Sequence, residues 1–553
     1  MRHRDEERVP ELWRRISATA APSLTLPGKR GRGLRRRIAV GVVLLLLALG
    51  VAAGLKVYEY TAAPPGEKDC AANPRFAGPP TAPALQIVEP PIPLAQKGGT
   101  INDASCLNRT PVYGIAKPAD EEALRKVVAF ARDNGLKLSI AGARHSMGGQ
   151  AFFTNALVIN TGNLKQMSLD GTHQLLTVQA GATWHDVLAY LHPRGFSVKV
   201  MQAIDPPTVG GSISVNAHGV DHRAGSLAST VRSLSVMLSD GSVHQVSRER
   251  EPELFASVMG GYGLFGIVLE AQLEVVPDVM YQYEQRTIDY QQFPQLFTQK
   301  LSQDPYRLMY GHLSTAPGSF LKEMLIYTYR DATGYTDPIP TLKDTSQVAP
   351  TRFFLNFAKT GAIGQEVKWF AEKKIMPLFR PCYVPRSQAL QAESCLVSRN
   401  QALYGSLGAL KTKLPADTEI LQEYFVPQDR LVPFIDSARQ VLEQHRAVVL
   451  NASIRVVHPG DIQLDYASHD MFSLVLFIDQ KVTPEGDRQM TSLTQAMVDA
   501  TARQGGTFYL PYQLDYRPDQ LQQAYPGVKA FFALKRKYDP AQLFTNEFYA
   551  AYG

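Results

Sequence analysis

Three glycine-bearing stretches decide the fold: IAGARHSMGGQ (Ile140–Gln150), PPTVGGSISVNAHG (Pro206–Gly219) and GGYGLFG (Gly260–Gly266). Each adjoins a short apolar run of the kind that forms a β-strand. Glycine between strands lets the backbone approach a ligand closely, and successive backbone N–H groups form concave sites that suit a pyrophosphate. A single loop of this kind is explained equally well by a tight turn. Three of them together predict a binding site for a dinucleotide cofactor.

The segments around these loops alternate between strand-like and helical patterns. Residues 121–134 (EEALRKVVAFARDN) have apolar residues at helical spacing and precede Gly135, a helix terminator, and the strand-like KLSIAG. A second helix is predicted to begin at Thr183 and run to Arg194. Further strands are predicted in ALVINT, LLTVQAG, SLSVMLSD and GIVLEAQLEVV, with a hairpin turn at Asp240-Gly241. Residues 100–277 are therefore predicted to form one α+β domain.

The order of the motifs resembles that of one family. A strand leads into R-H-S-x-x-G-Q, and T-V-G-G-x-x-S and G-G-x-G-x-F-G-I-V follow. This order is similar to the FAD-binding domain of the vanillyl-alcohol oxidase and p-cresol methylhydroxylase (PCMH) family. No Rossmann G-x-G-x-x-G follows a first strand, which argues against an NAD fold. The resemblance implies a two-subdomain FAD-binding domain of PCMH type and an α+β substrate (cap) domain.

The resemblance also implies which residues hold FAD. His145 matches the histidine that relatives bond to the flavin 8α carbon, so a covalent link is predicted, with an ordinary turn histidine as the alternative. Val268 falls where the family's adenine-side strand begins. Asn546, in YDPAQLFTNEFY (Tyr538–Tyr549), is implied to contact the isoalloxazine. The other residues implied to line the cofactor are Gly142, Ala143, Arg144, Ser146, Gly149, Gln150, Thr208, Gly210, Gly211, Ser214, Gly219, Gly263 and Gly266.

Residues 278–510 carry longer strands and helices and predict a substrate domain, and residues 511–553 predict a segment that returns to the FAD-binding domain. LQEYFVP (421–427) and ASIRVVHP (452–459) resemble strands of alditol and aldonolactone oxidases. Those enzymes act on the substrate hydroxyl with an E-x-R pair and a later Lys. Here the Arg is Arg455, but Ser453 stands at the Glu position and Tyr512 at the Lys position.

Oxidation of a C–H bond next to oxygen or nitrogen needs hydride delivery to flavin N5 and a group that accepts the remaining proton. Arg455 stays charged, so it is not a base, but it can stabilise a developing anion. The sequence does not choose among the candidate proton acceptors, or between that role and a surface salt bridge for the carboxylates. The candidates are Glu423, His458, Asp465 and Tyr512. His218 and His222 lack neighbours at metal-ligand spacing and are interpreted as structural or merely close to the site, so no metal is expected.

These patterns predict an FAD-dependent oxidoreductase that oxidises a small alcohol, sugar alcohol or lactone. The electron acceptor is oxygen or a membrane carrier such as a quinone or cytochrome. Two alternatives stay open. Amine oxidation of the cytokinin-dehydrogenase kind is supported by H-S-x-x-G-Q and opposed by LQEYFVP and ASIRVV. A flavin-binding or partner-binding protein without activity is supported by Ser453 in place of Glu.

The formal charge of +6 is concentrated near the N-terminus, where residues 1–37 hold eleven Lys and Arg against four Asp and Glu. The rest of the chain is left with −1, which argues against nucleic-acid binding. Residues 38–55 (IAVGVVLLLLALGVAAGL) follow Arg35-Arg36-Arg37 and are long enough to span a bilayer, with the N-terminus in the cytoplasm. A cleaved signal peptide ending near Val51-Ala52-Ala53 is the alternative.

The predicted organisation is therefore a cytoplasmic basic tail (1–37), a transmembrane signal anchor (38–55) and a Pro- and Ala-rich linker (56–99). The large domain is expected on the periplasmic or extracellular side, where disulfides are permitted. Cys382 and Cys395 are close in sequence and are the first pair expected, and four buried thiols are the alternative. The four cysteines are Cys70, Cys106, Cys382 and Cys395.

Overall fold

The computed structural model describes residues 50–61, 88–342, 348–379, 383–390 and 416–553. By its contacts the chain divides into Met1–Glu59 and Tyr60–Gly553. In the first unit, residues 50–59 are helical. None of the helices in the described ranges is both long and apolar enough to cross a bilayer. The predicted tail, most of the predicted span and residues 62–87 of the predicted linker lie outside the described residues.

The second unit begins with a mixed four-stranded sheet in the order β1–β4–β6–β5. The predicted helix and the strand after it are present as α2 and β5: β4 and β5 both pair in parallel with β6, and α2 connects β4 to β5. The side chain of Asp120 caps α2 by accepting from the Ala123 N–H, and apolar residues of α2 pack into one core with β5 and β6. The bounds are β1 (Leu94–Lys97), β2 (Thr100–Ile101), β3 (Thr110–Pro111), β4 (Gly114–Ala116), α2 (Glu121–Asp133), β5 (Leu138–Ala141) and β6 (Leu157–Asn160).

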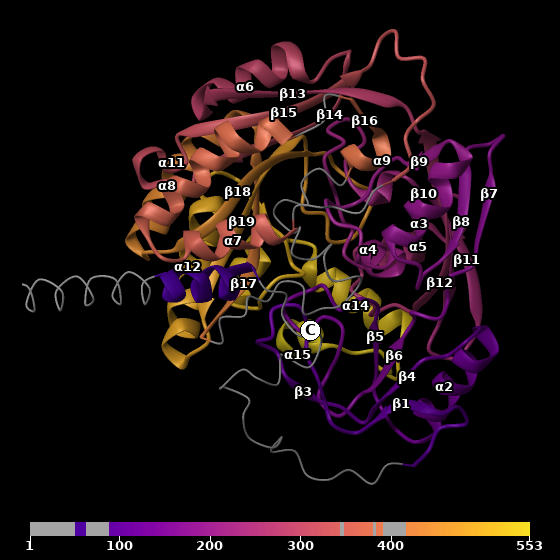
Figure 1. Ribbon diagram of the computed structural model, residues 1–553. Coiled ribbons are helices and arrows are strands. Elements are labelled where there is room, and N and C mark those ends of the chain that lie inside the picture. Colours follow the sequence, from indigo (N-terminus) through magenta and orange to yellow (C-terminus); the bar gives the residue numbers. More distant parts are fainter. Residues whose placement is uncertain (1–49, 62–87, 343–347, 380–382, 391–415) are drawn as a thin grey trace, which may run out of the picture. The chain divides into compact units, whose positions relative to one another are not determined.

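A second, antiparallel sheet follows in the order β11–β10–β12–β8–β7, with β9 also paired to β12. β10 and β11 form the predicted hairpin around Asp240-Gly241, and Thr183 caps the predicted second helix, α3. Figure 1 shows this sheet in magenta, next to the indigo strands of the first sheet. The bounds are β7 (Met167–Asp170), β8 (Leu175–Gln179), α3 (Trp184–Leu191), β9 (Phe196–Val198), α4 (Val209–Ser214), β10 (Val231–Met237), β11 (Val243–Ser247), α5 (Pro252–Val258) and β12 (Ile267–Pro277).

The third sheet has eight antiparallel strands in the order β16–β13–β15–β14–β18–β19–β17–β20. The step from the second sheet to this one falls between Pro277 and Met280. The strands are β13 (Met280–Asp289), β14 (Tyr306–Leu313), β15 (Glu323–Asp331), β16 (Tyr383–Pro385), β17 (Asp417–Pro427), β18 (Val448–Val457), β19 (Met471–Lys481) and β20 (Thr507–Phe508).

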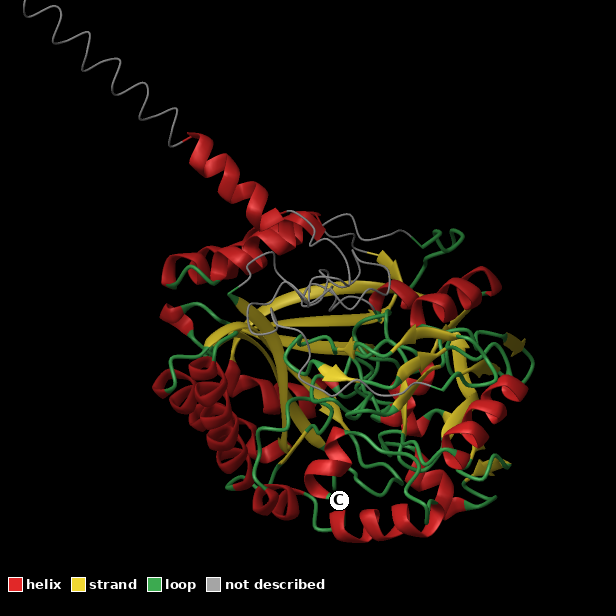
Figure 2. Ribbon diagram, turned by 90° about the horizontal axis from the view of Figure 1, so that it is seen from below, coloured by secondary structure: helices red, strands yellow, loops and turns green. Residues whose placement is uncertain are grey.

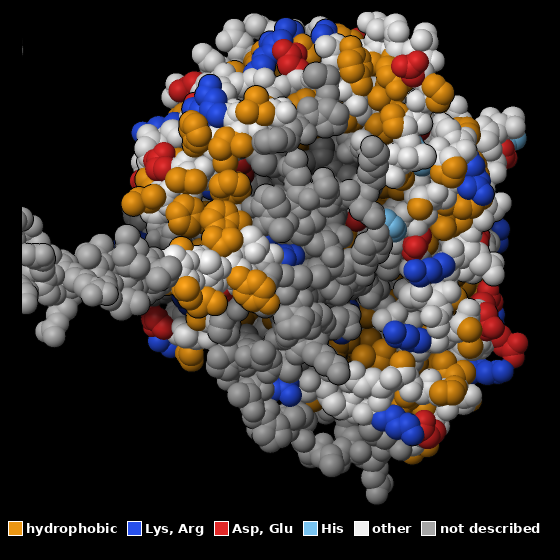
Figure 3. Space-filling model, viewed as in Figure 1, with side chains coloured by type: hydrophobic (Ala, Val, Ile, Leu, Met, Phe, Trp, Pro, Cys, Tyr) orange, Lys and Arg blue, Asp and Glu red, His pale blue; other side chains and the backbone are white. Residues whose placement is uncertain are grey.

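Helices cover one face of this eight-stranded sheet, and loops of the preceding half lie toward its other face (Figure 2). In the view of Figure 3, hydrophobic side chains gather on the surface over α7 and α8. The helices of this half are α6 (Phe293–Leu296), α7 (Val348–Ala358), α8 (Ala362–Phe370), α9 (Arg386–Ala389), α11 (Leu431–Gln444) and α12 (Pro484–Ala502).

The C-terminal segment returns to the first sheet (Figure 1). The Leu138 N–H donates to the Leu543 carbonyl at 2.8 Å, and the Thr545 N–H donates to the Leu138 carbonyl at 2.9 Å. Asp539 of the D-P motif is fully buried, and its carboxylate accepts from the backbone N–H groups of Leu543 and Phe544. This segment contains α13 (Pro518–Ala524), α14 (Val528–Tyr538) and α15 (Glu547–Tyr552).

Candidate active site

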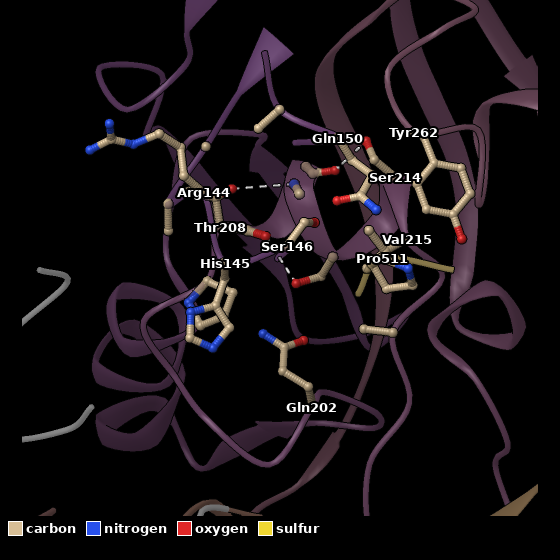
Figure 4. Close-up of a pocket in the computed structure, with 18 of the residues that line it drawn as sticks. Arg144, His145, Ser146, Gln150, Gln202, Thr208, Ser214, Val215, Tyr262 and Pro511 are labelled. Carbon is tan, nitrogen blue, oxygen red and sulfur yellow. Dashed lines mark hydrogen bonds between the residues drawn. The ribbon is translucent and has the colours of Figure 1, made fainter. Parts of the chain in front are cut away.

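One cavity lies between the glycine-bearing loops and a face of the eight-stranded sheet. Its volume is about 1350 Å³ with the open mouth included. The sheet contributes Leu421, Glu423, Arg455 and Val475, and Figure 4 shows the side chains from the loops.

Most residues predicted to hold the cofactor line this cavity, and residues that the motifs did not single out, such as Gln202 and Tyr509, line it as well. The predicted residues that line it are Gly142, Ala143, Arg144, His145, Ser146, Gln150, Thr208, Gly210, Gly211, Ser214, Gly263, Gly266 and Val268.

Three residues predicted to hold the cofactor do not line the cavity, and each makes other contacts: Gly149, Gly219 and Asn546. Gly149 has φ +73° and packs against Glu547, and a Cβ on Gly219 would lie 1.9 Å from the Met201 carbonyl oxygen. The Asn546 side chain accepts from the Tyr549 N–H at 2.9 Å and donates to the Tyr262 carbonyl at 2.8 Å. Its amide is therefore engaged in capping α15 and fixing a loop, which differs from the predicted contact with the isoalloxazine.

The glycines of the lining act mainly by allowing close packing. A Cβ on Gly142 would lie 2.1 Å from Oγ1 of Thr208, so any side chain there collides with the next loop. The Gly210 N–H donates to the Ala180 carbonyl at 2.8 Å, and the Gly211 N–H donates to Oγ1 of Thr208 at 3.2 Å. Some of the amides expected to form a pyrophosphate nest are thus used within the protein.

Gln150 connects the first motif to the C-terminal segment. Its Nε2 donates to the carbonyls of Leu510 at 2.9 Å and Tyr512 at 3.0 Å, and its Oε1 accepts from the Gly148 N–H at 2.9 Å. The Met147 N–H also donates to the Pro511 carbonyl at 2.8 Å. These bonds hold Pro511 and Tyr512 in the wall of the cavity.

His145 and Gln202 present polar atoms that fit a ligand in the cavity. Within the described residues, Nε2 of His145 and both amide atoms of Gln202 are buried without a hydrogen-bond partner. Both side chains line the cavity (Figure 4). Burial lowers the pKa of His145 to about 4, so its imidazole is neutral at neutral pH. Because buried polar atoms are normally hydrogen-bonded, these atoms suit a large polar cofactor.

Of the residues predicted to carry the chemistry, Glu423, Arg455 and Tyr512 line the cavity. Glu423 on β17 lies opposite Val475 on β19, and Val475 lies opposite Ser453 on β18. Residues directly opposed in a sheet point to the same face. The Glu423 carboxylate therefore lies in the same row across the sheet as Ser453, two strands away. The wall thus contains a Glu close to Arg455, although the residue two positions before Arg455 is Ser453 and not the expected Glu.

Glu423 forms a buried pair with His218. The carboxylate is 3% exposed, and its Oε1 lies 2.7 Å from Nε2 of His218. Burial alone raises the pKa of Glu423, but His218, Arg455 and Ser473 together hold the pKa below its usual value. Glu423 is therefore ionised at neutral pH and can accept a proton. The interpretation of His218 as structural or merely close to the site did not include this pairing, because its partner Glu423 lies far away in the sequence, on β17.

The pKa of Tyr512 is shifted in the opposite direction to that of Glu423. Burial, and after it the negative charge of Glu423, raise the pKa of Tyr512 well above its usual value. The phenol stays protonated at neutral pH, so it can donate a hydrogen bond but is a poor proton acceptor. Among the residues predicted as proton acceptors that reach the cavity, the geometry favours Glu423.

His458 and Asp465 do not line the cavity. Nδ1 of His458 lies 2.7 Å from the Asp470 carboxylate, and its Nε2 lies 2.7 Å from the His222 carbonyl. Asp465 accepts from the backbone N–H groups of Gly460 and Ala467, and burial raises its pKa to about 6. The structure thus places both residues in the loop after β18, where they hold the backbone, and not at the predicted reaction site.

Two further sequence expectations concern metals and cysteines. No three His, Cys, Asp or Glu side chains in the described ranges are placed to hold a metal ion. Cys106 is disulfide-bonded, which contradicts the alternative of four free thiols. Cys70, Cys382 and Cys395 lie outside the described residues, so the Cys382–Cys395 pair stays a prediction.

Comparison with known proteins identifies the part of the chain that carries the cofactor loops. A family model described as an FAD binding domain matches residues 112–247, which include His145, Gln202 and Thr208. This chain contains an FAD-binding domain. FAD is therefore the large polar cofactor that the buried polar atoms of His145 and Gln202 suit.

Relatives of this domain include oxidases and dehydrogenases. The decaprenylphosphoryl-β-D-ribose oxidase of Mycolicibacterium smegmatis is 32% identical over 170 residues, which are 30% of this chain and 37% of that protein. The L-gulonolactone oxidase of Mus musculus is 28% identical over 176 residues, 31% of this chain and 40% of that protein. Cytokinin dehydrogenase 2 of Arabidopsis thaliana is 29% identical over 163 residues, 29% of this chain and 32% of that protein.

The chain thus matches less than half the length of each of these relatives. The predicted resemblance to flavin-dependent oxidases of PCMH type is confirmed for the FAD-binding domain.

Proposed function

We propose that the protein is an FAD-dependent oxidoreductase that oxidises a small alcohol, sugar alcohol or lactone. The observation that carries the proposal is a cavity with the FAD-binding loops on one wall and Glu423 and Arg455 on the other, where His218 of the second loop pairs with Glu423. Bound FAD supplies the hydride acceptor, flavin N5. Relatives named for a ribose derivative and for lactones support a substrate with a carbon–oxygen bond at the reacting centre.

The protein residues divide the remaining work. The Glu423 carboxylate accepts the substrate hydroxyl proton, and His218 stabilises that carboxylate until it does so. The Arg455 guanidinium stabilises negative charge that develops on the substrate oxygen. Tyr512 donates a hydrogen bond, and the apolar Leu421 and Val475 restrict water at the same wall.

A substrate panel tests this activity directly. The purified holoenzyme is mixed anaerobically with sugar alcohols, aldonolactones and a cytokinin, and the flavin absorbance is followed. Bleaching by an alcohol or lactone supports the proposal. Bleaching by the cytokinin alone supports the second candidate, amine oxidation, which the relationship to cytokinin dehydrogenases favours. A flavin that no member of the panel reduces argues against both and for a protein without catalytic activity.

The proposal includes a covalent link between FAD and Nε2 of His145. The unpartnered and neutral state of that nitrogen in the cavity supports it. The test is flavin fluorescence of the acid-denatured protein on a gel, with His145→Ala compared with the exposed control His173→Ala. Fluorescence should stay with the wild-type and control bands and disappear from His145→Ala. Fluorescence lost from all three means that the flavin is held without a covalent bond.

We also propose that a single-pass anchor at residues 38–55 holds the enzymatic domain on the periplasmic or extracellular side. The charge of the first 37 residues and the disulfide at Cys106 support this location. Oxygen, a quinone or a cytochrome then accepts the electrons. Resistance of the full chain to alkaline extraction, together with protease access from outside, is the expected result. A mature N-terminus near Val51 would indicate a cleaved signal peptide instead.

A further inference from the structure

Five apolar side chains on one stretch of the second unit are exposed to solvent. On α8, Ile363, Val367 and Phe370 are 77%, 39% and 56% exposed. Ile375 and Leu378, in the two turns that follow α8, are 39% and 78% exposed. We refer to these five residues as the α8 patch. Figure 3 shows hydrophobic side chains gathered on the surface over α7 and α8.

An ordinary surface helix turns its apolar side toward the core, whereas α8 turns its apolar side toward solvent. Residues 363, 367 and 370 follow helical spacing and form one apolar stripe, and this stripe faces outward. The inward side carries Gly364, Lys368 and Trp369, and Lys368 is paired with Glu372 at 2.7 Å. Scattered exposed apolar residues are common, whereas a contiguous patch marks a contact surface.

Helix α7, which is next to α8, contacts the first residues of the second unit, Tyr60 and Thr61. Arg352 donates to the Thr61 carbonyl at 2.8 Å, Asn356 donates to the Tyr60 carbonyl at 3.1 Å, and the rings of Tyr60 and Phe353 lie 6.1 Å apart. α7 and α8 are consecutive and pack against each other. The start of this unit is thus attached beside the α8 patch.

Chain length links this attachment to the predicted span. The apolar run ends at Leu55, five residues before Tyr60, and residues 50–61 are helical. At a rise of ~1.5 Å per residue, five helical residues cover ~8 Å. A membrane crossing that ends at Leu55 therefore leaves only this short length of chain between the bilayer and Tyr60, the residue that contacts α7.

We infer that the α8 patch inserts into the lipid headgroup region as a second membrane contact beside the predicted span. The inference rests on the proposed anchor. Apolar faces of interfacial helices sink ~5–10 Å into the boundary between headgroups and acyl chains, which suits side chains such as Phe370 and Leu378. One span alone leaves the domain free to rotate about its linker, and a second contact gives the cavity a defined orientation toward the membrane.

The experiment uses the full-length holoenzyme in vesicles of phosphatidylcholine and phosphatidylglycerol. A photoreactive leucine analogue with a diazirine replaces Ile363 or Leu378, and lipid adducts are counted by mass spectrometry after irradiation. Leu47 in the predicted span is the positive control. Lys126 on α2 is the negative control, since it is exposed and α2 lies across the unit from α8 in Figure 1. The analogue is small enough to leave the fold intact at each exposed position.

Lipid adducts at positions 363 and 378, together with none at 126, are expected and support the inference. Adducts at 47 without adducts at 363 or 378 overturn the inference and leave the anchor standing. A lack of adducts at 47 contradicts the anchor by itself, whatever positions 363 and 378 show. Adducts from 363 and 378 to a second copy of the chain, in place of lipid, overturn the inference and assign the patch to a dimer.

Discussion

The two walls of the cavity are built in different ways. The wall that contains His145 and Thr208 consists of loops, and each loop is a contiguous motif whose neighbouring residues act together. The opposite wall consists of strands, and Glu423, Val475 and Arg455 meet there through the pairing of β17, β19 and β18. Local sequence therefore encodes the cofactor wall, whereas strand register creates the substrate wall. Substitutions in the first should affect FAD binding, and substitutions in the second should affect turnover.

In the loop wall, the largest effect is expected from Gly142→Ala, and it falls on FAD binding. The new Cβ would lie 2.1 Å from Oγ1 of Thr208, and overpacking of this kind costs ~1–3 kcal/mol. Flavin affinity should fall by roughly tenfold or more, because ~1.4 kcal/mol corresponds to one factor of ten. The measurement is flavin bound per protein at a series of FAD concentrations. Gly171→Ala is the control, since its Cβ meets the Phe196 ring at an ordinary 3.5 Å. Full flavin retention in Gly142→Ala would show that the two loops can separate without loss of the site.

In the strand wall, the largest effect is expected from Glu423→Gln, and it falls on turnover. Glu423→Gln keeps the shape of the side chain but removes its ability to take a proton. The kcat should fall by ~10²- to 10⁴-fold, the usual contribution of a general base, while flavin content stays at the wild-type value. Steady-state kinetics and the flavin absorbance of the same sample measure both quantities. Glu443→Gln, at an exposed position of α11, should behave as wild type. An unchanged kcat in Glu423→Gln would mean that another residue is the base.

The pH dependence tests the pairing within that wall. His218 helps to hold the pKa of Glu423 below its usual value, so the reactive carboxylate is present above that lowered pKa and is lost as pH falls through it. His218→Gln removes the imidazole contact that lowers the pKa of Glu423, so the pKa of Glu423 should rise. The acidic limb of kcat/KM should then move to higher pH, whereas His173→Gln should leave it in place. An acidic limb that does not move in His218→Gln would mean that another group controls it.

The smallest effect is expected outside both walls. His458→Ala removes contacts with Asp470 and the His222 carbonyl, on a side chain that is 28% exposed. Such partly exposed pairs contribute ~0–1 kcal/mol, so the melting temperature should change little and kcat should stay close to wild type. Thermal unfolding and kcat are measured on the same preparation. A fall in kcat as large as that of Glu423→Gln would mean that His458 takes part in the reaction.

Particular residues show how far sequence reasoning reached. His145, Gln150 and Thr208 were predicted at the cofactor and line the cavity, because each belongs to a motif that is complete within a few residues. Glu423 was one of several candidate bases, and only its place opposite Val475 and next to His218 separates it from Asp465 and His458. Gln202 belongs to no motif and was missed.

The sequence by itself determined the FAD-binding loops, the capped helix α2 and the hairpin at Asp240-Gly241. These features depend on glycine geometry, helix capping and apolar periodicity, which act between residues close in the chain. Tertiary structure decided that Glu423 pairs with His218, that Asn546 is engaged by Tyr262, and that α8 turns its apolar stripe outward. Those outcomes depend on which distant strands and helices pack together, and neighbouring residues do not specify that packing.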